Sequence, residues 1–181
     1  MKYISEKTIC DAGVFTVAQV ELKKGDRKVL HSVVRFPGTV CVLPVTEKGS
    51  IILERQYRSP AGDCLVEIPA GKIDKGEDSA GCMVRELEEE TGFKAVKFKK
   101  IYEAYTSCGC LDEYLHYYIA LVKKIDEDKR TLFPDSNEDI EIFEVSKEEA
   151  MVMIEEKKIV DAKTILMITN YFSGLIYIDQ E

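Results

Sequence analysis

The stretch of sequence that decides the fold is Gly71-Lys-Ile-Asp-Lys-Gly-Glu77-Asp-Ser-Ala-Gly-Cys-Met-Val-Arg85-Glu86-Leu-Glu-Glu-Glu90-Thr-Gly92-Phe93. It predicts a glycine turn, then a short helix that carries many carboxylates. Asp78 or Ser79 can cap the start of this helix through a side-chain oxygen. Gly92 suits the left-handed backbone conformation that commonly follows a helix end.

The predicted helix has an acidic face and an apolar face. Residues three and four apart lie together on a helix, so Glu86, Glu89 and Glu90 converge. The apolar stripe consists of Ala80, Met83, Val84 and Leu87. Like charges at this spacing destabilise an isolated helix, and a divalent cation such as Mg²⁺ would relieve that repulsion. Arg85 is placed to hold Glu88 or Glu89 in one orientation. A solvated acidic face is the usual alternative, but it explains neither the glycines nor Arg85.

The composition bounds the class of protein. A chain of 181 residues that is 45% hydrophobic can form one domain with a substantial core. The net charge of -8 argues against a nucleic-acid partner, which would need a basic surface. The six cysteines form no C-x-x-C pair, which argues against zinc. No signal peptide or membrane-spanning run is visible, so we expect no membrane partner and a cytoplasmic protein with reduced thiols.

The remaining chain predicts strands in the middle and helices at the end. Residues 14–36 resemble an antiparallel hairpin, and strands are expected at 39–45, 51–57, 64–69, 96–105, 114–122 and 141–145. Helices are expected from Ser146, with Glu149 completing a capping box, and from about Asp161 to Phe172. This order indicates the class α/β, with a mixed sheet between helices in an α/β/α sandwich. Glu67 interrupts an apolar strand and is either exposed, paired with an arginine or near a metal.

The opening stretch matches the Nudix box position for position, and the chain therefore resembles the Nudix hydrolase family. The matching residues are Gly71, Glu77, Arg85, Glu86, Leu87, Glu89, Glu90, Gly92 and Phe93. The resemblance implies a Nudix-type fold and pyrophosphate hydrolysis with Mg²⁺, or Mn²⁺, as cofactor. It assigns Glu86 and Glu90 as metal ligands, with the backbone carbonyl of Ala70 as a further one. Glu89 and Arg85 are catalytic candidates, and Arg85 with Glu77 is expected to orient the site.

Further segments are similar to the ADP-ribose pyrophosphatase branch of that family. They are Gln56-Tyr-Arg58, Glu67-Ile-Pro-Ala-Gly71, Gly109-Cys-Leu-Asp-Glu113, Asn137-Glu-Asp-Ile140 and Ile159-Val-Asp-Ala-Lys-Thr-Ile165. The similarity implies hydrolysis of ADP-ribose, or a related nucleoside diphosphate sugar, to AMP and ribose 5-phosphate. It also implies a homodimer in which residues 1–38 contribute to the dimer and 39–181 form the catalytic core of a single domain, 1–181. Arg58, Glu113 and Gln56 become substrate-binding candidates. Glu138 becomes both a metal ligand and a catalytic candidate, and Phe15 or Phe36 a candidate for stacking on adenine.

Two positions depart from the branch and leave alternatives open. Cys108 stands where the branch commonly has proline, so GDP-mannose, FAD or another nucleotide stays possible as substrate. Ser136 stands where some relatives have a catalytic glutamate, which leaves Glu138, Asp135, Glu89 or a metal alone to activate water. A regulator that binds ADP-ribose without cleaving it is the alternative from another class. The pair Cys108 and Cys110 is interpreted as loop thiols, because its spacing is not that of a redox motif.

Overall fold

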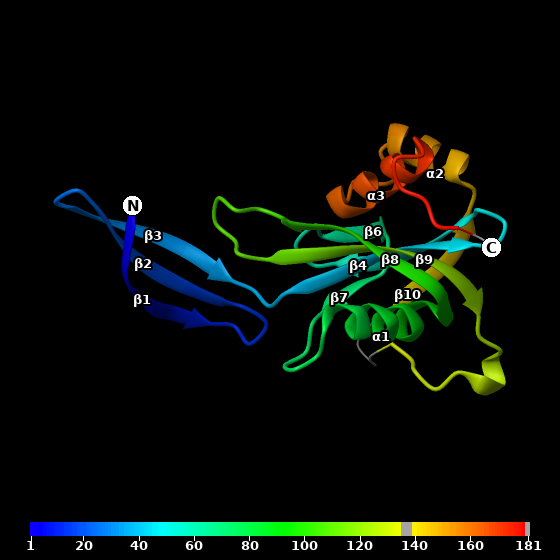
Figure 1. Ribbon diagram of the computed structural model, residues 1–181, viewed down its shortest axis with the longest axis horizontal. Helices are drawn as coiled ribbons and strands as arrows, with labels where there is room; N and C mark the ends of the chain where they lie inside the picture. Colours follow the sequence, from blue (N-terminus) through cyan, green and yellow to red (C-terminus); the bar gives the residue numbers. More distant parts are fainter. Residues whose placement is uncertain (135–138, 180–181) are drawn as a thin grey trace. The chain divides into compact units, whose positions relative to one another are not determined.

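The computed structural model describes residues 1–134 and 139–179 and divides into two compact units (Figure 1). The first unit comprises Met1–Thr39 and Glu103–Leu115, and the second comprises Val40–Tyr102 and His116–Glu181. Each unit is described by itself. The single domain, and the part of residues 1–38 in a dimer, stay predictions.

The first unit is built on a three-stranded antiparallel sheet in the order β1-β2-β3. Its strands are β1 (Lys2–Asp11), β2 (Thr16–Lys24) and β3 (Arg27–Arg35). The predicted hairpin is confirmed as β2 and β3. Strand β1 was not predicted, because charged residues interrupt the apolar ones in its sequence. In the structure every residue of β1 is exposed. Its backbone pairing with β2, rather than a buried face, makes it a strand.

The second unit contains most of a seven-stranded sheet with the path β10-β5-β4-β9-β8, to which β6 is joined through β5 and β7 through β4; Thr39, the end of β8 and the start of β9 belong to the first unit. The strands are β4 (Thr39–Thr46), β5 (Ile51–Arg58), β6 (Asp63–Glu67), β7 (Ala70–Lys72), β8 (Phe93–Tyr105), β9 (Tyr114–Lys124) and β10 (Ile140–Val145). Seven consecutive residues of β4 are buried, as the continuous apolar run predicted. The short strand β7, which carries Ala70 and Gly71, was not predicted.

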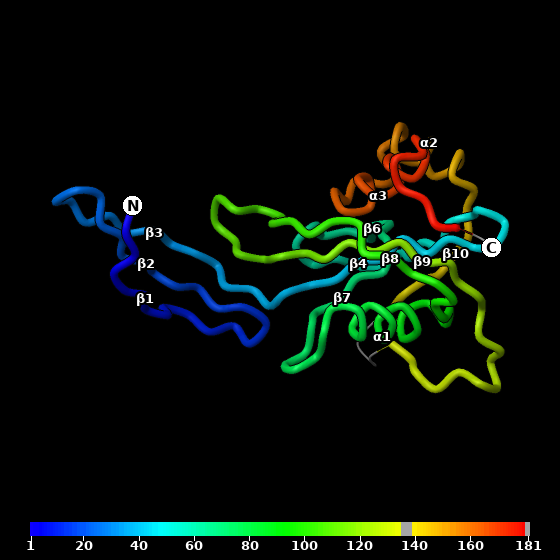
Figure 2. Tube along the Cα trace, in the orientation of Figure 1, coloured from blue at the N-terminus to red at the C-terminus, as the bar shows by residue number. Residues whose placement is uncertain are grey.

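Helices cover both faces of this sheet, as Figures 1 and 2 show. Helix α1 (Ser79–Thr91) lies on one face, and α2 (Lys147–Glu155) and α3 (Ala162–Phe172) lie on the other. A short 3₁₀ helix spans Glu127–Lys129. The predicted capping box at the start of α2 is present, with Ser146 and Glu149 bonded reciprocally. The three layers and the mixed sheet confirm the predicted α/β/α sandwich. Within the described residues, no helix is both long and apolar enough to span a bilayer.

Candidate active site

Helix α1 has the ends and the faces that its sequence predicts. The Asp78 side chain caps the first turn by accepting hydrogen bonds from the backbone N–H groups of Ala80 and Gly81. Gly92 adopts the left-handed conformation with φ 70° and donates its N–H to the Glu88 carbonyl. The apolar stripe packs into one cluster with the sheet, formed by Val40, Val42, Ile52, Cys82, Met83, Leu87, Tyr118, Ala120 and Val122. This packing fixes the helix, so its acidic face has a defined direction.

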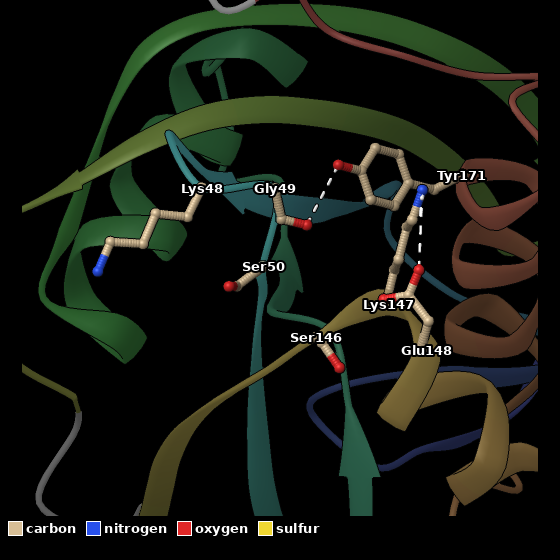
Figure 3. A pocket seen from close by; sticks show the side chains of 7 residues that line it. All are labelled: Lys48, Gly49, Ser50, Ser146, Lys147, Glu148 and Tyr171. Carbon is tan, nitrogen blue, oxygen red and sulfur yellow. Dashed lines mark hydrogen bonds and ion pairs between the residues drawn. The ribbon is translucent and has the colours of Figure 1, made fainter.

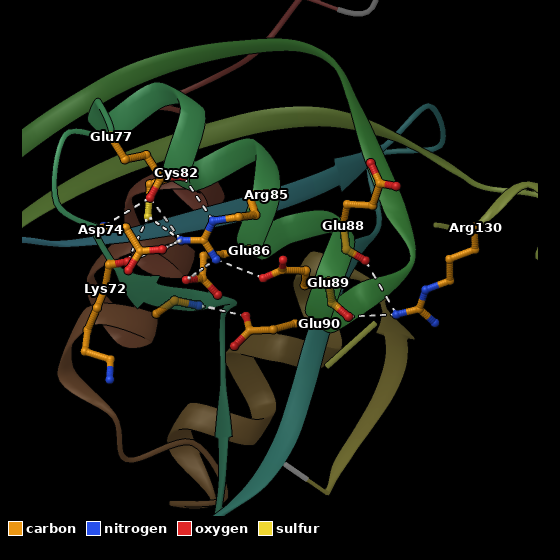
Figure 4. Close-up of polar contacts among 11 residues, drawn as sticks. Lys72, Asp74, Glu77, Cys82, Arg85, Glu86, Glu88, Glu89, Glu90 and Arg130 are labelled. Carbon is orange, nitrogen blue, oxygen red and sulfur yellow. Dashed lines mark hydrogen bonds and ion pairs between the residues drawn. The ribbon is translucent and has the colours of Figure 1, made fainter. Parts of the chain in front are cut away.

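Arg85 organises three of the box carboxylates (Figure 4). Its Nε and Nη2 donate to the two carboxylate oxygens of Glu77, each at 3.0 Å. Its Nη1 donates to Glu89 at 2.8 Å and lies 2.9 Å from Glu86. The hydrogen bonds from Arg85 lower the pKa of Glu77 to about 2. Arg85 therefore contacts Glu86 and Glu89 of α1, and of the two partners predicted for it, Glu88 and Glu89, the contact observed is with Glu89.

The start of the box meets the end of α1 at strand β7. The backbone N–H of Ala70 donates to the Glu90 carboxylate at 3.1 Å, and Glu90 is only 5% exposed. A Cβ atom at Gly71 would overlap the carboxyl group of Glu86, so this carboxyl group lies directly against the glycine backbone. The structure therefore brings Ala70, Glu86 and Glu90, the three predicted ligands among the described residues, to one short segment of backbone.

A second charged cluster lies on strands β5 and β6 and the first turn of α3. Arg58 donates from Nε and Nη2 to the two oxygens of Glu67, at 2.9 and 3.0 Å. Lys163 contacts the same carboxylate and lies 3.1 Å from Asp161. Burial acts to raise the pKa of Glu67, but Arg58 and Lys163 hold it below its usual value. Of the three readings of Glu67, pairing with an arginine is the one observed; Glu67 is 3% exposed, so the exposed-face reading is wrong.

Glu54 and Gln56 lie on β5 beside that cluster. They share a strand face with Ile52, which packs against α1, because alternate residues of a strand point to the same side. Glu54 is 0% exposed and Gln56 8%. Neither Glu54 oxygen, nor the Gln56 side-chain oxygen, has a hydrogen-bond donor among the described residues. Gln56 was predicted as a substrate-binding candidate, whereas Glu54 was not named as a site residue. The alternation of side chains along the strand from Ile52 could have indicated that Glu54 faces α1.

Arg130 is a further residue that sequence reasoning missed. It donates from Nη2 to the backbone carbonyl of Glu89 at 2.7 Å, and the Glu88 carbonyl lies at 3.5 Å (Figure 4). Its guanidinium also lies over the ring of Phe133, 4.8 Å from the centroid. A cation beside the carbonyls at the C-terminal end of a helix is favourable electrostatically. Arg130 thereby stabilises the end of α1 that carries Glu89 and Glu90.

Glu113 belongs to the first unit, where two threonines hold it. Thr39 and Thr106 donate to its two oxygens at 3.1 and 2.7 Å. The neighbouring Asp112 accepts from the Phe36 backbone N–H and from Arg35. These contacts position the carboxylate within its own unit; its predicted contact with substrate stays a prediction.

Three further predictions concern the acidic loop, the two loop cysteines and Phe15. Glu138, Ser136 and Asp135 lie outside the described residues. Cys108 and Cys110 are exposed thiols, as expected for loop residues. Phe15 is 38% exposed, and its predicted stacking on adenine stays a prediction.

A pocket of about 310 Å³ lies between the β4–β5 turn, the start of α2 and Tyr171 of α3 (Figure 3). It is lined by Lys48, Gly49, Ser50, Ser146, Lys147, Glu148 and Tyr171. The Tyr171 hydroxyl donates to the Gly49 carbonyl at 3.3 Å. None of the predicted site residues lines this pocket, and the chemistry of the box lies on α1 and β7 instead.

The box residues fit a divalent cation by the chemistry of their donors. Within residues 1–134 and 139–179, no three His, Cys, Asp or Glu side chains already surround a common metal-sized site. Glu86 and Glu90 nevertheless border the same backbone segment, and both offer the hard oxygens that Mg²⁺ and Mn²⁺ prefer. The buried Glu54 carboxyl group, which lacks a donor, is the orphaned group that a cation nearby would satisfy.

Comparison with known proteins agrees with this architecture. The NUDIX domain model matches residues 35–166, which include the box helix, β5 and the cluster around Glu67. The chain therefore belongs to the Nudix hydrolase family and is a pyrophosphohydrolase of that family.

Several relatives are similar over most of their length. An ADP-ribose pyrophosphatase of Bacillus subtilis (strain 168) is 42% identical over 171 residues, 91% of each chain. A methanol dehydrogenase activator of Bacillus methanolicus is 35% identical over 173 residues, 92% of each. A GDP-mannose pyrophosphatase of Citrobacter koseri is 34% identical over 154 residues, 79% of this chain and 78% of that one. A crystal structure of an ADP compounds hydrolase shares the fold, with a TM-score of 0.81, 20% identity and coverage of 97% and 95%.

Proposed function

We propose that this protein hydrolyses the pyrophosphate bond of ADP-ribose, or a related nucleoside diphosphate sugar, with Mg²⁺ as cofactor. The observation that carries the proposal is the convergence of Glu86 and Glu90 on Ala70 and Gly71. The similarity to an ADP-ribose pyrophosphatase, over 91% of each chain, supports ADP-ribose as the first substrate to test. The products would be AMP and ribose 5-phosphate.

Different residues of the chain would bind the cation, bind the phosphate and accept the proton. Glu86, Glu90 and the Ala70 carbonyl would hold the cation, which supplies charge neutralisation and a more acidic water. Arg58 uses Nε and Nη2 on Glu67, which leaves its Nη1 edge for a phosphate oxygen. Arg85 keeps Glu89 oriented, so that Glu89 can accept the proton of the attacking water. Glu138 is the alternative base. Water forms the new bond to phosphorus as the bond to the bridging oxygen breaks, so the two phosphates separate.

The proposal extends to a cytoplasmic homodimer. Exposed apolar side chains gather in the first unit: Tyr3, Ile4, Ile9, Val14 and Leu30 are each at least 42% exposed. Such exposure favours a protein–protein contact. The exposed thiols of Cys108 and Cys110 suit a reducing compartment.

A product assay tests the reaction. The purified protein is incubated with ADP-ribose and Mg²⁺, and the nucleotides are separated. We expect AMP, loss of activity with a chelator, and its return with Mg²⁺ or Mn²⁺. GDP-mannose is the second substrate, because GDP-mannose pyrophosphatases are among the relatives. Absence of any nucleoside monophosphate from both substrates would refute the proposal, and tight binding of ADP-ribose without cleavage would favour a regulator instead.

Replacing one proposed ligand tests the site. Glu90→Gln removes the charge but keeps the shape, and the Gln oxygen can still accept the Ala70 N–H. We expect turnover to fall at least about 10²-fold, since charge stabilisation at the reacting phosphates is lost. Far-UV circular dichroism should be unchanged. Glu141→Gln, at an exposed carboxylate paired with Arg55, is the control and should keep its activity.

A further inference from the structure

Glu54 is a buried carboxyl group that the box does not explain. It is fully buried on β5, directly across from Glu67 on β6. Arg58 is the basic group beside it, but its Nη2 is 3.9 Å from Glu54 and is already bonded to Glu67. Glu54 shares a strand face with Ile52, which packs against α1, and the Glu90 carboxyl group of that helix is among its neighbours. Glu54 thus borders the proposed metal site from a strand outside the box.

The charges around Glu54 do not balance. Three acidic side chains meet here, Glu54, Glu67 and Glu90, and each is at most 5% exposed. Two basic groups face them, Arg58 and Lys163; both are engaged with Glu67, and Lys163 also lies 3.1 Å from Asp161. A buried carboxylate without a hydrogen-bond donor is strongly unfavourable, and Arg58, the basic group that forms an ion pair with Glu54, is shared with Glu67. Carboxyl groups therefore outnumber basic groups in this cluster, and a cation held by Glu90 would add positive charge to it.

Gln56 provides a second, independent observation at the same place. Its side-chain oxygen is also buried without a hydrogen-bond donor, and it lies on the same face of β5 as Glu54. Two buried oxygens without donors, at neighbouring positions of one strand face, indicate a ligand that offers positive charge and several hydrogen-bond donors. A hydrated cation is such a ligand.

We propose that Glu54 is a further carboxylate ligand for the divalent cation, contributed by β5 to the site that Glu86 and Glu90 form on α1. The inference rests on the proposed function, because it assumes that a cation binds at the box. It adds a ligand that no position of the box motif contains. Gln56 would contact the water shell of that cation rather than the cation itself.

Binding of Mn²⁺ alone, without nucleotide, tests the inference. Free Mn²⁺ is counted by electron paramagnetic resonance during titration of the wild-type protein and of Glu54→Gln. We expect affinity to fall roughly tenfold or more, the loss typical of groups that orient or bind a metal. Glu141→Gln, the same change on the neighbouring strand β10, should stay within about twofold of wild type. An equal affinity in wild type and Glu54→Gln would overturn the proposal.

A second variant separates ligation from a structural role. Glu54→Leu replaces the buried carboxyl group by an apolar side chain, which often leaves stability equal or higher. We expect its thermal midpoint without metal to be at least that of wild type, while Mn²⁺ affinity falls. A lower midpoint with unchanged affinity would show that Glu54 has a structural role. If either Glu54→Gln or Glu54→Leu fails to fold, the Mn²⁺ affinity of the other variant still tests the proposal.

Glu90→Gln distinguishes failure of this inference from failure of the proposed function. If Glu90→Gln loses Mn²⁺ while Glu54→Gln retains it, the box site stands and the assignment of Glu54 is wrong. If both variants bind Mn²⁺ like wild type, the proposed metal site on α1 is itself wrong.

Discussion

Gly71 matters because it has no side chain. The carboxyl group of Glu86 occupies the space where a Cβ atom would be, and this contact involves the flexible end of Glu86 rather than backbone. A larger residue at position 71 would therefore displace a proposed ligand and leave the fold intact. The box motif therefore requires glycine at position 71, so that the Glu86 carboxyl group can lie directly against the backbone.

Gly71→Ala should separate activity from stability. We expect activity to fall about 10²-fold, the effect of a small misplacement of a reacting group, with little change in the denaturation midpoint. Gly81→Ala is the matched control, because a Cβ there meets only Asp78 at an ordinary distance of 3.8 Å. It should be neutral or stabilise the helix by up to about 1 kcal/mol. Equal activity in both variants would contradict the role of Gly71.

Glu77 should contribute a pH-dependent part of the stability. Arg85 lowers the pKa of Glu77 to about 2 in the folded protein, whereas the unperturbed value is 4.5. A lowered pKa stabilises the fold above pH 4.5, and this contribution is lost as the pH falls from about 4.5 towards 2. The difference in stability between wild type and Glu77→Gln should therefore shrink over that range. Urea titrations at several pH values measure it, and a constant difference would contradict the assignment.

At the scale of elements, the ends of α1 show what local sequence can predict. Asp78 and Gly92 act within one turn of the residues they cap, so their roles follow from position alone. Arg130 reaches the same helix from 41 residues away along the chain. No local pattern identifies such a contact, because it depends on how β9 returns the chain to the end of α1.

Arg130→Met should destabilise the C-terminal end of α1. It keeps an apolar stem but removes the hydrogen bond to Glu89 and the favourable charge at the helix end. We expect a loss of about 1–2 kcal/mol in the free energy of unfolding, measured by urea denaturation. Lys129→Met, at an exposed side chain paired with Asp126, is the control and should change stability by less than about 0.5 kcal/mol. Similar losses in both would count against this role.

At the scale of the whole molecule, the open prediction is the homodimer. Light scattering after size-exclusion chromatography should give twice the chain mass of 20.5 kDa. Replacing Ile4 and Ile9, both exposed on β1, by lysine should shift the mass towards the monomer if this strand contributes to the contact. A monomeric wild type would refute the dimer, and a dimer unaffected by both changes would place the contact elsewhere.

The sequence by itself determined the box helix, its caps, its buried stripe and the reaction class, because these depend on residues within a few turns of one another. It also indicated the three layers, since strand and helix periods are local. Only the tertiary structure decided the partners of Glu67, the contact of Glu86 with Gly71, and the presence of Glu54 beside Glu90. Those arrangements join strands, a turn and helices from separate parts of the chain, and packing rather than local pattern determines which buried charges meet.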